Sequence, residues 1–486
     1  MNEKLKKFIF SEQERNNYSL YKNDYKISFE FNIPDKYKPK NREEFFLPYF
    51  QIPLNSDKIR INPIDEDFFH KNIFIEKSGK VYTPFFIHPT SVDIFKDWIN
   101  KKYSFIDETK SIFKATPTSS YRSLLVQNIV TNQYFITKVS IFGNVANGAR
   151  QIDWLSADGQ FFFSTCTEKA VKNKKDFKIL RDSAAIGMTG DYPIRLSSKY
   201  NITYGPNKIQ SFGNIIRRVD EIFDDNTETA IYSIASITSV NDKNDCYFQK
   251  IYNASGKTFE NFFINDFMLI IFDKFFRLLS TSGISLESHC QNTFIEVTRD
   301  WKFTGNIVYR DFDITSLDRA RFPFVFPKEW SEYISNRLDR TSLYSNLSAR
   351  EMIGQNFFEQ LLGSLEQACL LCAVELELIP LEISNKIHKK LCELFKNKLA
   401  KLFPIYDKEI FSKTDWLFWK DIYKNIDISE IPTELNIIKK FDKRSYERIL
   451  INNPEHQISE YYETKNKFIL GFSNNIFTEL YRERLI

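Results

Sequence analysis

The segment GISLESHCQN, residues 283–292, decides how the rest of this chain is interpreted. If residues 284–297 are extended, alternation places Glu287, His289 and Gln291 on one face of the strand. An acid, an imidazole and an amide that share a face are costly to bury without a ligand or a metal ion. The segment therefore predicts a polar binding site, and an exposed polar strand face is the alternative.

A second acidic segment, YRDFD at residues 309–313, follows in the sequence. Glu287 and Asp311 together could hold Mg²⁺, which takes few carboxylates and keeps water ligands for phosphate oxygens. A simple hairpin that turns near Trp301–Gly305 would set Asp311 opposite Glu296. The two carboxylates therefore meet only if a twist or a bulge helps.

Two earlier segments combine basic side chains with hydroxyl groups or glycines. KATPTSSYR, residues 114–122, ends in Arg122, and a guanidinium fork with nearby hydroxyls suits a phosphate. KVSIFGNVANGAR, residues 138–150, begins with Lys138 in a strand-like run. Its two glycines are not followed by Lys-Ser/Thr, which excludes a P-loop. A Ser/Thr/Pro turn and an exposed hairpin are the alternatives for these segments.

Bulk composition describes an ordinary globular chain. Its 486 residues are 42% apolar and 27% charged, and this length predicts roughly two to four domains. Lys and Arg total 67 against 63 Asp and Glu, so the charge gives no support for a nucleic-acid partner. The apolar run Phe267–Phe272 is too short for a membrane span, and the N-terminus lacks a signal-peptide core. We therefore expect a cytoplasmic protein without a membrane partner.

The order of patterns predicts an α+β protein with a mainly antiparallel sheet in the middle and a helical C-terminal half. Residues 1–76 indicate short elements and turns, residues 77–245 are strand-rich, and residues 246–486 are mostly helical. The expected strands include Tyr134–Phe142, Gly159–Ser164 and Ala230–Val240. The expected helices include Asn265–Ser280, ended by Gly283, and Ala349–Ile379 and Ser384–Phe403.

Cysteine and histidine positions add two weaker signals. Cys369 and Cys372 form a CxxC inside a helical run, and no second pair or nearby His completes a zinc set. Buried helix thiols are therefore predicted. His88-Pro89 follows an apolar run, so the imidazole is expected to point into a cleft at the end of a strand, with a purely structural histidine as the alternative.

Taken together and in order, these segments resemble the IucA/IucC-type synthetases, which make siderophores without a nonribosomal peptide assembly line. The resemblance covers residues 80–315. The motifs that carry it are His88-Pro89, Thr118-Ser119-Ser120-Tyr121-Arg122, the run from Lys138 to Arg150, the block Gly283-Ile284-Ser285-Leu286-Glu287-Ser288-His289-Cys290-Gln291-Asn292, and Arg310-Asp311.

The resemblance implies a cupped-hand fold of thumb, fingers and palm around a central cleft. Residues 1–76 would form a shortened thumb-like region. Residues 77–245 would form a fingers-like β-rich domain with the ATP-binding segments. Residues 246–486 would form a palm-like domain with the Glu-x-His-x-Gln-Asn motif. The family also allows a homodimer.

The activity implied by the resemblance is that of an ATP-dependent ligase. It would adenylate a carboxylate of citrate or a related polycarboxylate and condense it with an amine, hydroxylamine or alcohol. AMP and pyrophosphate would be the by-products, in siderophore biosynthesis for iron acquisition. ATP and Mg²⁺ are the implied cofactors.

The resemblance also implies residue roles. Catalysis would use His289, Arg122, Arg150 and Lys138. ATP would be bound by Ser119, Ser120, Arg122, Lys138, Arg150, Gln291, Asn292 and Asp311. The substrate would be bound by His88, Lys138, His289 and Arg310. Mg²⁺ would be held by Glu287, Asn292 and Asp311.

Departures from the family pattern keep two alternatives open. The double His-Pro thumb motif is not visible, and Ala146 stands where a Thr usually precedes the second Arg. A degenerate, non-catalytic paralogue that acts as a binding or partner subunit is therefore one alternative. A kinase-like phosphotransferase is the other, because His289-x-x-Asn292 followed by Asp311 is similar to a catalytic loop and its metal-binding Asp. However, this sequence lacks the acid that usually precedes the Asn in a kinase and lacks the kinase glycine-rich loop.

Overall fold

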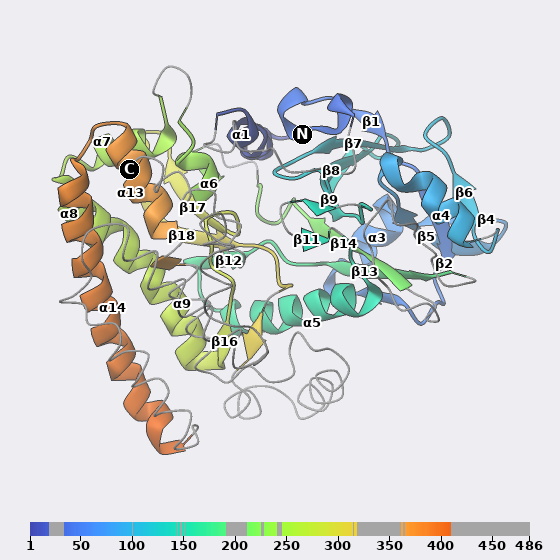
Figure 1. The fold of residues 1–486 in the computed structure, drawn as a ribbon. Coiled ribbons are helices and arrows are strands. Elements are labelled where there is room, and N and C mark those ends of the chain that lie inside the picture. Colours follow the sequence, from blue (N-terminus) through green and yellow to red (C-terminus); the bar gives the residue numbers. More distant parts are fainter. Residues whose placement is uncertain are drawn as a thin grey trace, which may run out of the picture. The chain divides into compact units, whose positions relative to one another are not determined.

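The computed structural model describes residues 1–18, 34–99, 101–142, 144–145, 148–149, 151–190, 211–224, 228–240, 245–313, 315–317, 361–362 and 365–409. The chain forms two compact units. The first comprises Met1–Lys172, Lys178–Tyr232 and Val308–Asp313, and the second comprises Asn173–Phe177, Ser233–Ile307 and Ile314–Ile486. Antiparallel sheets and helices make it an α+β protein, as predicted (Figure 1). The division into thumb, fingers and palm stays a prediction.

A seven-stranded antiparallel sheet is the centre of the first unit. Its strands are, in spatial order, β1 (Phe45–Phe46), β7 (Phe113–Pro117), β8 (Ser123–Asn128), β9 (Gln133–Lys138), β14 (Ser211–Arg218), β13 (Ala184–Thr189) and β3 (Ile59–Ile61). β9 confirms most of the strand predicted over Tyr134–Phe142. A hairpin, β10 (Asn144–Val145) with β11 (Gly148–Ala149), follows β9 in the chain.

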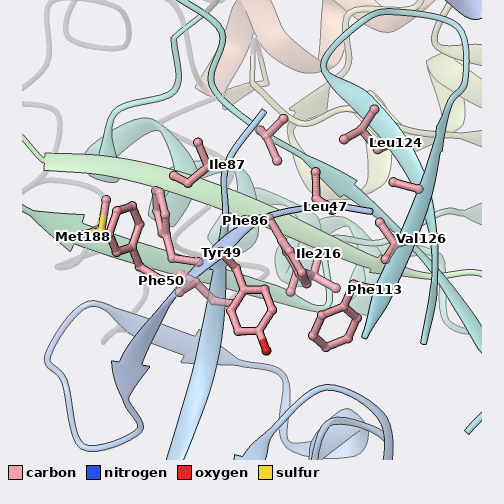
Figure 2. Close-up of a cluster of buried hydrophobic side chains, with 14 of the residues drawn as sticks. Leu47, Tyr49, Phe50, Phe86, Ile87, Phe113, Leu124, Val126, Met188 and Ile216 are labelled. Atoms are coloured by element: carbon pink, nitrogen blue, oxygen red, sulfur yellow. The ribbon is translucent and has the colours of Figure 1, made fainter. Parts of the chain in front are cut away.

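A second sheet packs against the first across an aromatic core. Its order is β4 (Ile75–Lys77), β5 (Lys80–Phe86), β2 (Tyr49–Pro53) and β6 (Ser104–Ile106), with helices α3 (Glu66–Asn72) and α4 (Val92–Ile99) beside it. Figure 2 shows Tyr49, Phe86 and Phe113 meeting in this core. The ring centroids of Phe86 and Phe113 lie 5.0 Å apart, edge to face, a favourable aromatic geometry.

Helix α5 (Trp154–Val171) covers the other face of the large sheet at β13 and β14 (Figure 1). Gly187 and Gly213 sit opposite each other in these strands. A Cβ on Gly213 would lie 2.4 Å from the Cβ of Ala157, so only glycine lets the helix approach this closely. The strand predicted over Gly159–Ser164 is wrong. Asp153 caps the helix and the close packing overrides the β propensity of the three phenylalanines.

The N-terminal region contains a helix that the turn-rich prediction for residues 1–76 missed. Helix α1 spans Glu3–Tyr18, and Leu5, Phe8 and Ile9 are buried along one face. Apolar residues at spacings of three and four are the usual signature of such a helix. The many charges between them obscured this pattern in the sequence.

In the residues that the structure describes, the second unit is built mainly from helices. They are α6 (Ile234–Ile237), α7 (Tyr247–Ser255), α8 (Phe259–Asn261), a π-helical segment η6 (Phe262–Met268), α9 (Leu269–Ser282), α13 (Gln367–Glu375) and α14 (Leu381–Glu409). The helix predicted over Asn265–Ser280 is confirmed, and Gly283 ends it with φ 70° in the left-handed region. The strand predicted over Ala230–Val240 ends early, because Ser233 caps α6.

Strands β17 (Thr293–Thr298) and β18 (Phe303–Tyr309) lie in a four-stranded sheet of order β12-β18-β17-β15, whose outer strands are β12 (Phe177–Ile179) and β15 (Thr229–Ser233). Glu296 accepts a hydrogen bond from Asn306 at 2.7 Å. The prediction that Asp311 faces Glu296 is therefore wrong, because the chain turns earlier, at Thr298 to Lys302.

The single strand predicted over residues 284–297 is also wrong. Only β16 (Ile284–Ser285), which pairs with β19 (Ser316–Leu317), and β17 are extended. Between them the His289 carbonyl accepts from the amides of Asn292 and Thr293, both at 3.1 Å. Local side-chain bonds of this polar segment compete with a strand, and the Gln291 amide donates to the His289 ring at 3.1 Å.

The thiols of Cys369 and Cys372 are buried in α13, as predicted, and Cys372 Sγ lies 3.3 Å from Cys246 Sγ. Within the described ranges, no helix is both long enough and apolar enough to cross a membrane.

Candidate active site

Lys138 ends strand β9 in the first unit. It pairs with Ser123 of β8 on one side and Ile215 of β14 on the other, so its side chain shares the sheet face that α5 covers. The side chain is 4% exposed, and Nζ lies 2.8 and 2.9 Å from the two carboxylate oxygens of Asp311. Burial lowers the pKa of Lys138, and Asp311 opposes that fall. Lys138 and Asp311, two residues that were each predicted for the site but not as a pair, thus meet in space.

Asp311 follows strand β18 and returns to the first unit. Its backbone has φ 75°, which is uncommon for a residue other than glycine and marks a constrained position. The Tyr309 hydroxyl donates to the Asp311 carbonyl at 2.9 Å and helps hold this conformation. Burial alone would raise the pKa of Asp311, but Lys138, Arg217 and Arg122 together hold it well below its usual value.

Arg217 and Asp182 belong to the same cluster, and the sequence did not single them out. Arg217 Nε donates to Asp182 Oδ1 at 2.5 Å, and Arg217 Nη2 lies 3.7 Å from Asp311 Oδ1. Arg217 is only 2% exposed, yet its Nη2 has no hydrogen-bond partner among the described residues. A buried donor without a partner costs about 1–3 kcal/mol. Such a donor beside a lysine and another arginine indicates a place for an anion.

The signal for Arg217 was present in the sequence but could not be interpreted there. Arg217 and Arg218 follow an apolar run in SFGNIIRR, residues 211–218. One of two adjacent arginines at a strand end is ordinarily solvent-exposed. The register of β14 between β9 and β13 puts Arg217 on the α5 face and Arg218 on the other, where it pairs with Asp65 at 2.9 Å.

Arg122 lies in the turn before β8, half-buried, where its carbonyl accepts from the Val139 amide at 2.9 Å. Burial lowers the pKa of Arg122, and the carboxylates of Asp313 and Asp311 oppose that fall. Among the described residues, its guanidinium forms no hydrogen bond and no ion pair. A guanidinium kept near carboxylates but bonded to none is available to a ligand.

Arg310 and Ser119 form a second, adjoining link. Arg310 Nη2 donates to Ser119 Oγ at 3.0 Å, and Arg310 Nη1 donates to Glu12 Oε2 of α1 at 2.6 Å. The predicted site residues Ser119 and Arg310 are thus brought together, with Glu12 as a partner that the sequence did not reveal. Ser120 lies in the same turn, where its Oγ accepts from the Ser123 amide at 3.3 Å.

Helix α5 adds neutral polar groups to the cluster. Ser156 Oγ donates to Asp313 Oδ1 at 2.8 Å and accepts from Gln160 Nε2 at 3.2 Å. Gln160 Oε1 in turn lies 3.5 Å from Lys138 Nζ. These groups connect the helix to the charged residues, so the α5 face of the sheet is polar where β9 ends.

The motif residues of the second unit form a group of their own. His289 Nε2 lies 3.7 Å from Glu287 Oε2, and Asn292 Nδ2 donates to the Glu287 carbonyl at 3.3 Å. Gln291 lies in the same turn. Their predicted roles in catalysis and in ATP and metal binding stay predictions.

His88 lies in the aromatic core of the first unit. It is 0% exposed, its Nδ1 lies 2.6 Å from Thr90 Oγ1, and its ring is 5.1 Å from that of Tyr37. Burial lowers the pKa of His88 to about 3. The structure does not bring it into the Lys138–Asp311 cluster. Arg150 and Ala146 lie outside the described residues.

The described residues fit a polyphosphate better than they fit a magnesium ion. Arg122, Arg217 Nη2 and the Ser119 and Ser120 hydroxyls are groups that bind phosphate oxygens. No group of three or more His, Cys, Asp or Glu in the described part of the chain could hold a metal. Asp311 is already bound through both oxygens by Lys138. In this arrangement it does not fit Mg²⁺.

Comparison with known proteins shows which solved structures share this fold. No protein-family model and no curated protein matches the sequence. Solved structures do match the fold, among them the following three. ATP-bound aerobactin synthetase IucA from a hypervirulent pathotype of Klebsiella pneumoniae is 15% identical, with a TM-score of 0.57 over 76% of this chain and 66% of that one. Aerobactin synthetase IucC from the same source is 14% identical, with a TM-score of 0.54 over 78% and 67%.

The petrobactin biosynthesis protein AsbB from Bacillus anthracis str. Sterne is 15% identical, with a TM-score of 0.57 over 81% of this chain and 67% of that one. The chain thus spans about two thirds of the length of each of these proteins. This agreement confirms the IucA/IucC-type resemblance at the level of the fold. The chain has the fold of the aerobactin synthetases IucA and IucC and of the petrobactin biosynthesis protein AsbB.

Proposed function

We propose that this chain is an ATP-dependent synthetase of siderophore biosynthesis. It adenylates a carboxylate of citrate or a related polycarboxylate and condenses it with an amine, hydroxylamine or alcohol. The shared fold supports this proposal, since one of the matched structures is an ATP-bound aerobactin synthetase. The ordered motifs that end in Arg310-Asp311 support it independently of the fold.

One observation carries the proposal. The Arg122 guanidinium has no hydrogen-bond or ion-pair partner among the described residues, and Arg217 Nη2 is a buried donor with no hydrogen-bond partner there, in a cluster that also contains Lys138. Three cations lie near one another, and the two arginines carry donors that no described residue satisfies, which suits a ligand with several negative charges. A nucleotide triphosphate together with a polycarboxylate meets that description.

The cations would act by neutralising charge. Both reactants are anionic, so negative charge builds up at the phosphorus that the carboxylate attacks, and fixed positive groups stabilise it. Arg217 is fixed by Asp182, whereas Lys138 sits on a flexible four-carbon stem and can turn from Asp311 to the ligand. ATP supplies the adenylyl group that is transferred to the carboxylate, with pyrophosphate as the leaving group, and the chain supplies the binding and orientation of both reactants.

The proposal also includes the roles that the motif resemblance implies for His289, Glu287 and Arg150. His289 would steady the carboxylate of the substrate, with Glu287 beside it, and Arg150 would add a further phosphate contact. Mg²⁺ would require Lys138 to leave Asp311 first. A homodimer is part of the proposal only by resemblance.

Pyrophosphate release tests the proposed activity. We would screen citrate, 2-oxoglutarate and other polycarboxylates, with hydroxylamine as a general trap for the activated carboxylate. Formation of AMP and pyrophosphate is expected. Formation of ADP would favour the kinase-like alternative. ATP binding without turnover across the panel would favour a non-catalytic binding subunit.

Arg122→Ala tests the site. Removal of one contact to developing negative charge lowers rates by roughly 10²–10³, and we expect that loss with the fold retained. Arg60→Ala is the matched control, because Arg60 is an exposed arginine on β3 of the same unit. Full turnover by Arg122→Ala would show that the cluster is not the active site.

A further inference from the structure

Two neighbouring side chains of helix α1 reach the predicted nucleotide-binding turn. Glu12 Oε2 accepts from Arg310 Nη1 at 2.6 Å, and Gln13 Nε2 donates to the Pro117 carbonyl at 2.8 Å and lies 3.2 Å from Thr116 Oγ1. Glu12 is 0% exposed. The helix therefore contacts the end of β7, where the turn begins, and it does so with buried polar groups.

Arg310 connects Glu12 to the turn. Its Nη1 is bound to Glu12, and its Nη2 donates to Ser119 Oγ at 3.0 Å. A guanidinium has a rigid planar fork, so fixing one of its nitrogens fixes the direction of the other. Glu12 thereby orients the bond to Ser119 through Arg310.

A need for stability alone does not explain a carboxylate at this position. Burying a charged pair costs desolvation that its own attraction offsets only with good geometry, and well-packed apolar residues often serve equally well. Helix α1 already buries Leu5, Phe8 and Ile9 on the same unit. A buried charge is more useful where it sets the direction of a second charged group.

We propose that Glu12 is a positioning residue of the candidate active site, which acts through Arg310 to fix the turn that carries Ser119, Ser120 and Arg122. The consequence for a nucleotide rests on the proposed function. The hydrogen-bonded link from Glu12 through Arg310 to the turn does not depend on the proposed function.

The link can be measured without any ligand. The Thr118 amide is bonded to the Ser123 carbonyl at 2.9 Å and closes the turn. Glu12→Gln keeps the size of the side chain but removes the charge. We expect hydrogen exchange of the Thr118 amide to become roughly tenfold faster, because weakening a charged hydrogen bond releases the turn.

Asn128→Ala is the matched control. Asn128 is a buried polar residue at the opposite end of β8, and its Nδ2 donates to the Asn72 carbonyl at 2.7 Å. Its loss destabilises the same sheet without touching the turn. Thr118 exchange in this variant should change only as much as that of the other slow amides in the sheet.

ATP affinity distinguishes a positioning role from a purely structural one, because a purely structural role of Glu12 would not depend on Arg310. We expect Glu12→Gln to weaken ATP binding roughly 10-fold, while the same substitution in an Arg310→Gln background changes the affinity less than about twofold. The reason is that Glu12 acts only through Arg310. Equilibrium dialysis or calorimetry with ATP measures all four members of the cycle.

The outcomes separate the two proposals. If wild-type protein binds no ATP, the proposed function fails, and the exchange experiment still decides the role of Glu12. Unchanged Thr118 exchange in Glu12→Gln overturns the positioning role. So does an equal loss of ATP affinity with and without Arg310. Should Glu12→Gln not fold, Glu12→Asp is used instead, since it keeps the charge and shortens the reach to Arg310.

Discussion

Replacing Arg217 tests the electrostatic interpretation of the cluster most directly. Among the described residues, Arg217 is the one side chain that pairs with the Asp182 carboxylate, which is 0% exposed, so Arg217→Met removes that partner while Asp311 keeps Lys138. Burial already raises the pKa of Asp182 against the pull of Arg217. Without the guanidinium, Asp182 must either stay charged and unpaired or take up a proton.

The size of the effect follows from the burial of both partners. Breaking a buried ion pair by removing one partner costs about 3–5 kcal/mol, because the other charge is left uncompensated. Replacing both partners by apolar groups is often close to neutral. We therefore expect Arg217→Met to lose about 3–5 kcal/mol in the first unit and Arg217→Met with Asp182→Leu to recover most of it.

Hydrogen exchange of the slowest amides of β9, β13 and β14 measures this free energy of unfolding for the first unit alone. That choice matters, because a chain with two units need not unfold in one step. A loss below about 1 kcal/mol in Arg217→Met would refute the reasoning. Failure of the double variant to recover stability would equally show that Asp182 is not the group left uncompensated.

Two further predictions concern the core and the helix that covers the sheet. His88 has its pKa lowered to about 3 by burial, so the unfolded chain binds the extra proton and stability falls as the pH drops below about 6.5. At pH 5 this costs about 2 kcal/mol relative to pH 7, and a denaturant series in His88→Gln should lose that component. Gly213→Ala places a methyl group 2.4 Å from the Cβ of Ala157 and should cost about 1–3 kcal/mol. Thermal unfolding should show the loss, and adding Ala157→Gly should restore most of it.

Local patterns in the sequence were sufficient for much of the secondary structure. A strand from Tyr134 and a helix ended by Gly283 are present as predicted, although β9 ends at Lys138 and not at Phe142. The sequence failed where neighbouring polar groups compete with the backbone, as between Glu287 and Asn292. It also failed where packing overrides propensity, as in the phenylalanine-rich middle of α5.

The sequence by itself determined which residue types were available for the site, because hydroxyl, guanidinium and carboxylate groups recur in a recognisable order. Only the tertiary structure decided their partners. Glu12 meets Arg310 across 298 positions of the chain, and Lys138 meets Asp311 across 173. Asp182 meets Arg217 through the register of two strands. Such pairs depend on strand register and on which sheet face is buried, and neither is encoded in the local sequence around one residue.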